Sequence, residues 1–349
     1  MSGGFGSAVM ALRIGTGPQM RRRKFLVLLV SAAAAGSNNV EAQQQTSSLR
    51  RIGALWSLSE TNPDMRARLA QFHQGLERLG WSEGKNIQLD GQFAGGETDR
   101  FEPLAKALVA SRPEAIVAQS TPVALALLRQ TRSIPIVFVS VSDPIGSGLV
   151  ASLARPGGNV TGVLLYEEGI AGKWLAMLKE VAPKITRVAI VANPKTTPFD
   201  YFLQTAKGPA ASLAIDIVPM PVETAADIER SMQAFAGKPN GGLVLPPDST
   251  NILHRDVLIA LAAKHGLPSV YGYRSFTEAG GLMSYSTDVP QQNRLVASLV
   301  DRILRGTAPA DLPVETPTKY ETAINITAAK ALGLEIPSVL LARADDVIE

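Results

Sequence analysis

The sequence predicts an α/β protein whose parallel sheets are divided between two lobes. From Arg51 onward, short apolar runs rich in β-branched residues alternate with longer segments of helical periodicity, which is the pattern of strand–helix–strand units. The alternation runs through two successive series of similar layout. About 307 residues follow Ala42, more than a single hydrophobic core usually serves, so two lobes are the natural expectation.

The first series predicts strands and helices between residues 52 and 165. The runs IGALW at 52–56 and AIVA at 115–118 are continuously apolar, as in strands buried on both faces, whereas residues 87–93 alternate. Apolar residues recur every three or four positions from Met65 to Leu79 and Gly80 follows, which predicts a helix at 64–79. The other strands are expected at 134–139 and 159–165, and the other helices at 100–111 and about 122–130.

The second series repeats this layout, and a tail follows it. Strands are expected at 188–192, 215–219, 242–245 and 269–271, and helices at 174–181, 199–213, 225–235 and 252–265. The tail predicts strands at 282–286 and 320–326 and helices at 291–305 and 328–332. Since these last elements extend neither series in a simple way, they indicate a chain that crosses between the lobes more than once.

The N-terminal segment has the features of an export signal. Four cations (residues 21–24) precede an apolar run that starts at Phe25, and a small-x-small sequence ends at Ala42. The apolar part spans roughly 11 residues, whereas a membrane-spanning helix needs about 20. We therefore expect residues 1–42 to be removed after Ala42, with Met20 as the true start; the RRKFL sequence also resembles a twin-arginine signal. A lipid-surface anchor or chance basicity is the alternative.

Composition excludes several classes of function. Residues 1–42 hold five of the 34 Lys and Arg residues and one of the 31 Asp and Glu residues, so the remainder carries 29 cations and 30 acids. The basic charge thus belongs to the leader, and nucleic-acid binding is not indicated. The chain has no cysteine, which excludes disulfides, zinc–thiolate sites, iron–sulfur clusters and a cysteine nucleophile.

Polar residues follow the predicted strands at the point where each strand ends. Ligands of parallel sheets bind at these carboxyl ends, where loops and helix N-termini converge. Any one of these residues could merely cap a helix, but a set of them in both series favours one shared ligand cleft. The strand-end residues are Ser57, Ser59, Glu60, Gln119, Ser120, Thr121, Ser140, Ser142, Asp143, Asn193, Asp248 and Tyr271.

The sequence contains few features that indicate an enzyme. His73, His254 and His265 lie far apart and form no metal-binding spacing. No nucleophile elbow, phosphate-binding loop or dinucleotide fingerprint occurs at the expected place. We therefore expect no catalytic activity, no metal and no cofactor.

Several motifs resemble one known family. The run DPI at 143–145, the run GLV at 148–150 and the run LARPGGNVTG at 153–162 are similar to ABC-transporter substrate-binding proteins whose better-known members bind aromatic amino acids such as tryptophan. Segments 75–86, 308–315 and 328–337 also match, so the resemblance covers nearly all of residues 50–340. The chain departs from the family pattern at QSTP (119–122) and PPDS (246–249), where Gly-Thr-Pro and Pro-Thr-Asp-Asn are usual.

This resemblance implies a type I periplasmic-binding-protein fold, in which two doubly wound parallel-sheet lobes are joined by three crossovers. By analogy, the N-terminal lobe comprises residues 49–162 plus 286–313, and the C-terminal lobe comprises residues 163–285 plus 314–349. The ligand-binding positions that the resemblance implies are Ser57, Ser120, Thr121, Asp143, Tyr166, Asn193, Asp248 and Tyr271.

The function expected from this resemblance is that of a periplasmic solute receptor, a monomer that delivers a small polar or amino-acid-like ligand to the permease subunits of an ABC importer. Asp248 would pair with a ligand ammonium, Ser120 and Thr121 would hold a carboxylate, and tyrosines would pack on an apolar part. Two alternatives stay open: a ligand sensor for a histidine kinase or chemoreceptor, and an exported α/β hydrolytic enzyme.

Overall fold

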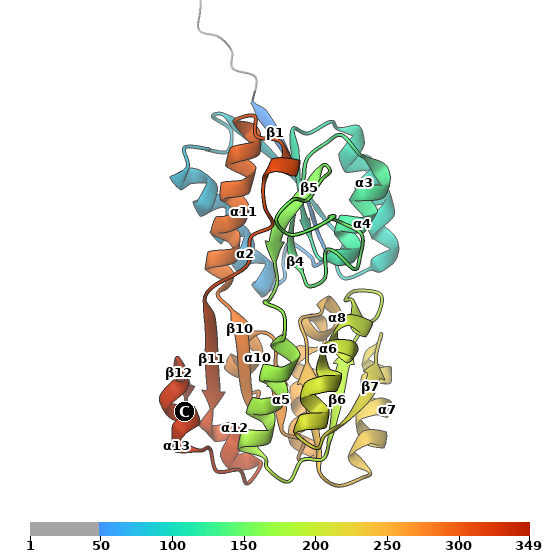
Figure 1. The fold of residues 1–349 in the computed structure, drawn as a ribbon, viewed down its shortest axis with the longest axis vertical. Helices are drawn as coiled ribbons and strands as arrows, with labels where there is room; N and C mark the ends of the chain where they lie inside the picture. The colour runs from blue at the N-terminus through green and yellow to red at the C-terminus, as the bar shows by residue number, and fades with distance from the viewer. Residues whose placement is uncertain (1–48) are drawn as a thin grey trace, which may run out of the picture. The chain divides into compact units, whose positions relative to one another are not determined.

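The computed structural model describes residues 49–349. The expected export segment, residues 1–42, lies outside the described residues. Within residues 49–349 the strands form two separate sheets, each covered by helices (Figure 1). We refer to the first sheet with its helices as lobe 1 and to the second sheet with its helices as lobe 2.

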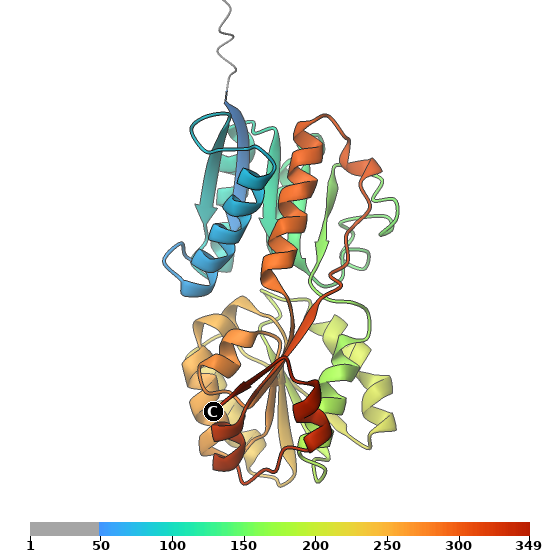
Figure 2. The ribbon, with the colours of Figure 1, turned by 90° about the vertical axis from the view of Figure 1, so that its left-hand side faces the viewer.

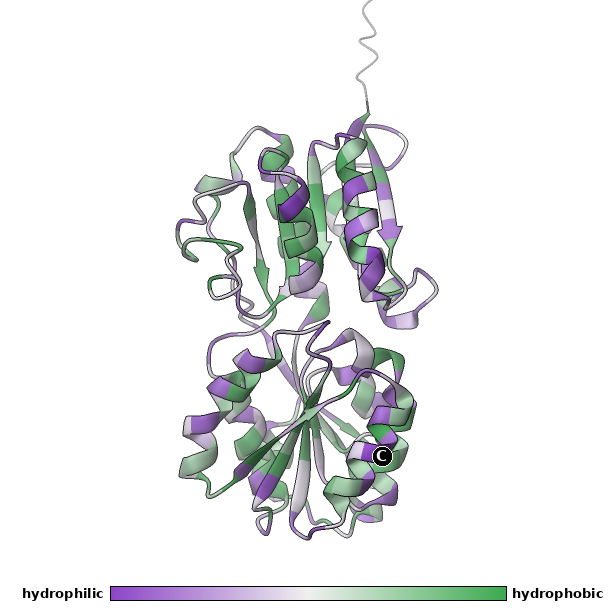
Figure 3. Cartoon of the chain, turned by 90° about the vertical axis from the view of Figure 1, so that its right-hand side faces the viewer, coloured by the Kyte–Doolittle hydropathy of each residue, from purple (hydrophilic) through white to green (hydrophobic). Residues whose placement is uncertain are grey.

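Lobe 1 contains a fully parallel sheet with the strand order β2-β1-β3-β4-β5. Its strands are β1 (Arg50–Trp56), β2 (Ile87–Phe93), β3 (Ala115–Gln119), β4 (Ile136–Val141) and β5 (Val160–Leu164). Its helices are α2 (Pro63–Arg78), α3 (Phe101–Ala110), α4 (Thr121–Gln130) and α11 (Val289–Leu304), with the short turns η1 (Thr98–Arg100) and η2 (Pro309–Asp311). Helices α2 and α11 cover one face, and α3 and α4 cover the other. Strands β3 and β4 are therefore buried along their whole length. Figure 3, coloured by hydropathy, shows that the central strands of this sheet consist mainly of hydrophobic residues.

Lobe 2 contains a mixed sheet with the strand order β12-β11-β10-β9-β8-β6-β7, in which only the β10–β11 pair is antiparallel. Its strands are β6 (Arg187–Ala192), β7 (Asp216–Pro221), β8 (Gly241–Leu245), β9 (Ser269–Tyr271), β10 (Met283–Thr287), β11 (Tyr320–Asn325) and β12 (Asp346–Ile348). Its helices are α5 (Ile170–Val181), α6 (Phe199–Ser212), α7 (Ala225–Ala236), α8 (Ser249–Leu253), α9 (Arg255–Lys264), α10 (Arg274–Glu278), α12 (Ile326–Ala331) and α13 (Ser338–Arg343).

The chain passes between the lobes three times. It leaves lobe 1 after β5, returns from β10 to α11, and leaves again between η2 and β11 (Figure 2). The crossovers are tied together, because the side chain of Gln292 on α11 donates to the backbone oxygen of Leu165 at 3.0 Å. The expected fold, two lobes with parallel sheets joined by three crossovers, is confirmed, except that β11 runs antiparallel to β10 in lobe 2. The residues at which the lobes were expected to divide stay a prediction.

Most expected strands and helices are confirmed, and the differences have local causes. The expected helix at 252–265 is two helices, since the chain turns at His254, which ends α8 and precedes α9. Helix α5 begins at Ile170, four residues before the expected start. Elements α10, α13 and β12 were not expected, because segments of three to six residues are too short to show a hydrophobic period.

Helices α2 and α11, more than 200 residues apart in the chain, pack side by side at Gly75 (Figures 1 and 2). A Cβ atom at Gly75 would lie 2.8 Å from the Cβ atom of Ala297, closer than two such atoms can approach. We expect Gly75→Ala to lower the free energy of unfolding by about 1–2 kcal/mol, although alanine is the better helix former by about 1 kcal/mol. Urea denaturation measures the difference in the free energy of unfolding between the variant and wild type. The exposed neighbour Gln74→Ala should stay within about 0.5 kcal/mol of wild type, and a stabilised Gly75→Ala would contradict the packing argument.

Candidate functional site

The carboxyl ends of β3, β4 and β8 meet in one small pocket between the lobes, which we call the interlobe pocket. Its lining residues are Gln119, Ser120, Thr121 and Ser140 from lobe 1, with Leu165, Thr196, Thr197, Pro198, Pro247, Asp248, Ser249 and Tyr273. The cavity has a volume of about 10 Å³, close to what one water molecule needs. The lobes touch at this place, since the hydroxyl oxygens of Ser57 and Ser249 lie 2.8 Å apart.

Lobe 1 contributes three buried hydroxyl groups that have no hydrogen-bond partner among residues 49–349. They belong to Ser120, Thr121 and Ser140. Leaving a buried hydroxyl unpaired costs about 1–3 kcal/mol, so three in one pocket indicate a polar ligand. Ser120 and Ser140 also have positive φ angles of 93° and 59°, a backbone strain that is frequent at binding sites.

The N-terminus of α4 points its free N–H groups toward the same place. Ser120 is the N-cap of this ten-residue helix but makes no side-chain hydrogen bond to the first turn. Pro122 occupies the first turn, where its missing N–H is not needed. The positive end of the helix dipole and the unpartnered hydroxyls therefore favour an anionic group.

Lobe 2 contributes a buried carboxylate, Asp248. Its Oδ1 atom accepts from the backbone N–H of Asn251 at 2.9 Å, which caps α8, and its Oδ2 atom accepts from the Thr196 hydroxyl. Asp248 is only 3% exposed, and this burial raises its pKa to about 6, although the hydrogen bonds oppose the rise. The interlobe pocket therefore has an acidic side on lobe 2 and a side rich in hydroxyl donors on lobe 1.

The eight residues expected to bind ligand do not all line this pocket. Ser120, Thr121 and Asp248 do. Ser57 lies just behind the lining, where its backbone N–H and its hydroxyl both donate to the side-chain oxygen of Gln119, at 3.1 and 2.6 Å. Ser57 therefore holds the lining residues in place.

Asp143 lies in an adjoining, larger pocket of about 670 Å³, which we call the outer pocket. The outer pocket shares Thr197 and Pro198 with the interlobe pocket and is also lined by Phe199 and Tyr201. One carboxylate oxygen of Asp143 accepts from the backbone N–H of Gly146 at 2.7 Å. The two pockets together provide a polar end and a wider, partly aromatic end.

Three expected residues make other contacts. The side-chain nitrogen of Asn193 donates to the Thr250 hydroxyl at 2.9 Å. The Tyr166 hydroxyl donates to the backbone oxygen of Gly272, and burial raises the pKa of Tyr166. Tyr271 stacks on Phe276 with ring centroids 5.0 Å apart and lines a separate pocket beside α9 and α12.

Two residues at or beside the interlobe pocket were not among those expected from the sequence. Tyr273, two residues beyond the end of β9, lines the interlobe pocket in the place where Tyr271 was expected. Arg68, on α2, lies with its guanidinium carbon 5.1 Å from the centroid of the Tyr273 ring. The sequence did contain a signal for Tyr273, because it lies two positions after Tyr271 and side chains at this spacing point to the same side of an extended chain. No sequence pattern distinguished Arg68 from the other residues of its helix.

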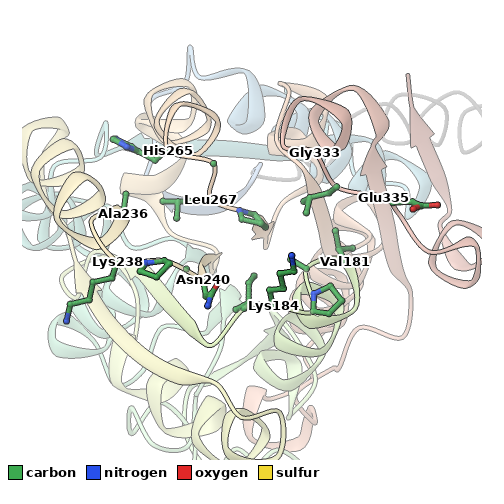
Figure 4. Close-up of a pocket in the computed structure, with 17 residues that line it drawn as sticks. Val181, Lys184, Ala236, Lys238, Asn240, His265, Leu267, Gly333 and Glu335 are labelled. Atoms are coloured by element: carbon green, nitrogen blue, oxygen red, sulfur yellow. The ribbon is translucent and has the colours of Figure 1, made fainter.

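A further pocket of about 530 Å³ lies at the opposite end of the lobe 2 sheet (Figure 4). It is lined by residues that precede β6, β8 and β9, including Lys184, Lys238 and His265. Figure 4 shows the Lys238 and His265 side chains pointing outward. Because ligands of parallel sheets bind at the carboxyl ends of the strands, this pocket is not the candidate site. Among residues 49–349 no group of three or more acidic, histidine or cysteine side chains could hold a metal ion.

The chain is similar over most of its length to known proteins. A family model described as ABC transporter substrate binding protein matches residues 37–348. A tyrosine-binding protein of Clostridioides difficile is 26% identical over 274 residues, which are 78% of this chain and 79% of that protein.

Solved structures show the same fold. A conserved domain protein of Vibrio cholerae has a TM-score of 0.79 at 30% identity and covers 85% of this chain and 99% of its own. An ABC domain of Streptococcus pneumoniae, solved in complex with L-Trp, has a TM-score of 0.80 at 24% identity and covers 86% of this chain and 100% of its own.

Proposed function

Since the chain belongs to the family of ABC transporter substrate-binding proteins, we propose that it is the periplasmic receptor of an ABC importer and carries an amino-acid-like ligand. The observation that carries this proposal is the pairing of chemistries in the interlobe pocket. Three unpartnered hydroxyls and a helix N-terminus from lobe 1 face the same cavity as the buried carboxylate of Asp248 from lobe 2. Such a pocket suits a ligand with an anionic and a cationic group.

Each part of the ligand has a place in this proposal. The hydroxyls of Ser120 and Thr121 and the N–H groups of α4 bind the ligand carboxylate. Asp248 binds the ligand ammonium. The outer pocket, with Phe199 and Tyr201, accommodates the side chain, and Asp143 lies at its edge. A relative named for tyrosine and a related structure with bound L-Trp support an aromatic side chain there.

Binding requires the lobes to separate and close again. Ligand pockets usually measure about 300–1,000 Å³, far more than the 10 Å³ of the interlobe pocket. The three crossovers are the only covalent connections between the lobes of the described chain, so they form the hinge. The closed form would present both lobes to the permease subunits.

Export fits the proposed location. No helix among the described residues is long and apolar enough to span a bilayer. The family match begins at residue 37, after the cations at 21–24 and the apolar run that starts at Phe25. We propose that this leader directs the protein to the periplasm, by the general or the twin-arginine route.

A thermal-shift panel tests this function on the protein without its leader. Amino acids, small carboxylic acids, sugars, amines and purines are added singly, and we expect aromatic amino acids to raise the melting temperature most. A ligand present at 100 times its Kd stabilises the folded state by about 2.7 kcal/mol, which is a shift of several degrees. A melting temperature that no compound changes would contradict the receptor function.

A further inference from the structure

Arg68 is a buried cation without an acidic partner in the part of the chain that the structure describes. Arg68 is only 4% exposed, and no other lysine or arginine is among the buried residues of 49–349. No carboxylate oxygen of residues 49–349 lies within 4.0 Å of a guanidinium nitrogen of Arg68, the distance that defines an ion pair. Buried arginines are almost always paired with a negatively charged group, so the unpaired charge of Arg68 needs an explanation.

The surroundings of Arg68 connect it to the interlobe pocket. Its guanidinium carbon lies 5.1 Å from the centroid of the Tyr273 ring, and Tyr273 lines the pocket. Arg68 belongs to lobe 1 and Tyr273 to lobe 2, so the contact crosses the cleft. The guanidinium also opposes the rise that burial causes in the pKa of Tyr273. An aromatic face compensates a buried charge only in part.

Holding the lobes together does not require this charge. Asp64, one helical turn before Arg68, already faces Arg255 of lobe 2 at 3.7 Å, and both side chains are partly exposed. The hydroxyls of Ser57 and Ser249 make a second contact between the lobes. A buried apolar residue would contact the Tyr273 ring at lower cost than an unpaired guanidinium.

Charge balance gives the Arg68 cation a role at this place. Asp248 is the buried acid that lines the interlobe pocket, and the other polar lining residues are neutral. Asp248 adds a full negative charge to the pocket, whereas the hydroxyls of lobe 1 and the N-terminus of α4 supply only partial positive charges, so without Arg68 the preference for a ligand carboxylate would be weak. The positive charge of Arg68 offsets that of Asp248 and makes the pocket suitable for a zwitterion.

We propose that Arg68 is a specificity residue, whose charge selects ligands that carry a carboxylate over the matching amines. The inference rests on the proposed function and deepens it. Tyr273, which lines the pocket, contacts the guanidinium, and the hydroxyls of Ser120, Thr121 and Ser140 donate hydrogen bonds to the carboxylate whose charge Arg68 balances.

Binding of matched ligands tests this proposal. Isothermal titration calorimetry compares L-tyrosine with tyramine, and L-tryptophan with tryptamine; each pair differs by one carboxylate. We expect wild type to prefer the amino acid by about tenfold to a hundredfold. Arg68→Met should lose most of this preference, and Arg68→Lys should keep more of it. Arg66→Met, which removes an exposed cation from the same helix, should behave as wild type.

A stability measurement separates recognition from a structural role. Removing an unpaired buried charge should leave the melting temperature of the empty Arg68→Met protein unchanged or higher. A lower melting temperature, with equal weakening of both members of a pair, would overturn the proposal. So would an unchanged amino acid preference in Arg68→Met, or a wild-type protein that binds sugars and no carboxylate, although the receptor function would then stand. A wild-type protein that binds no compound would overturn both.

Discussion

Asp248→Asn is expected to weaken binding of an amino-acid ligand by roughly a hundredfold and, at the same time, to stabilise the empty protein. Hydrogen bonds to a charged partner contribute about 1.5–3 kcal/mol, and asparagine offers the ligand ammonium no charge. Asparagine is as good an N-cap as aspartate, so helix α8 should keep its cap. Calorimetry with the best ligand of the panel measures the loss.

The stability gain should depend on pH in a defined way. Burial raises the pKa of Asp248 from 3.8, its ordinary value in an unfolded chain, to about 6 in the folded protein, so above pH 6 folding places a charge in a buried position. That difference of about two pH units corresponds to about 3 kcal/mol. Wild type regains this stability as the pH falls from 6 to 4, because the folded state binds the proton first.

Urea denaturation at pH 8 and pH 4 checks both statements. We expect Asp248→Asn to be more stable than wild type by up to about 3 kcal/mol at pH 8 and nearly equal at pH 4. Asp256→Asn, an exposed carboxylate on α9, is the matched control and should differ little at either pH. Full affinity for the amino acid in Asp248→Asn would show that this carboxylate does not bind the ammonium.

Trp174→Ala is expected to cost about 3–5 kcal/mol of unfolding free energy, the largest stability loss that we predict. Trp174 on α5 is 1% exposed and packs against Tyr166 and Phe202, with ring centroids 5.3 and 5.9 Å away. Its indole N–H also donates to the backbone oxygen of Tyr285 at 2.9 Å. The alanine variant leaves a cavity and an unpaired carbonyl beside the first crossover.

Thermal unfolding should show this loss as a drop of roughly 10 °C. Trp174→Phe keeps most of the buried ring and should lose less than half as much. Ligand affinity, measured below the melting transition, should be retained in both variants, because Trp174 does not line the interlobe pocket. A loss below about 1 kcal/mol in Trp174→Ala would show that this cluster does not anchor the crossover.

Periodicity predicted most of the secondary structure because it is a local property of the chain. The stripe from Met65 to Leu79 and the alternation at 87–93 correspond to α2 and β2. Short elements such as α10 were not predicted, since five residues are too few to show a hydrophobic period. Ser120, Thr121 and Asp248 could be expected near one another, because carboxyl ends of parallel strands share one edge of a sheet.

The choice of Tyr271 shows the limit of that reasoning. Counting residues to the end of β9 does not tell which side chain turns toward the other lobe, and the structure places Tyr273 there. Arg68 was beyond reach for another reason. Its burial depends on Tyr273, about 200 positions away in the chain, and no local pattern records such a neighbour.

The amino-acid sequence by itself determined the α/β class, the order of strands and helices, and the family, because periodicity and motifs are carried by neighbouring residues. Only the tertiary structure decided which polar groups share a pocket and which charges lack a partner. The physical reason is that solvation and pairing depend on distance in space: Ser57 and Ser249 are in contact although 192 positions separate them.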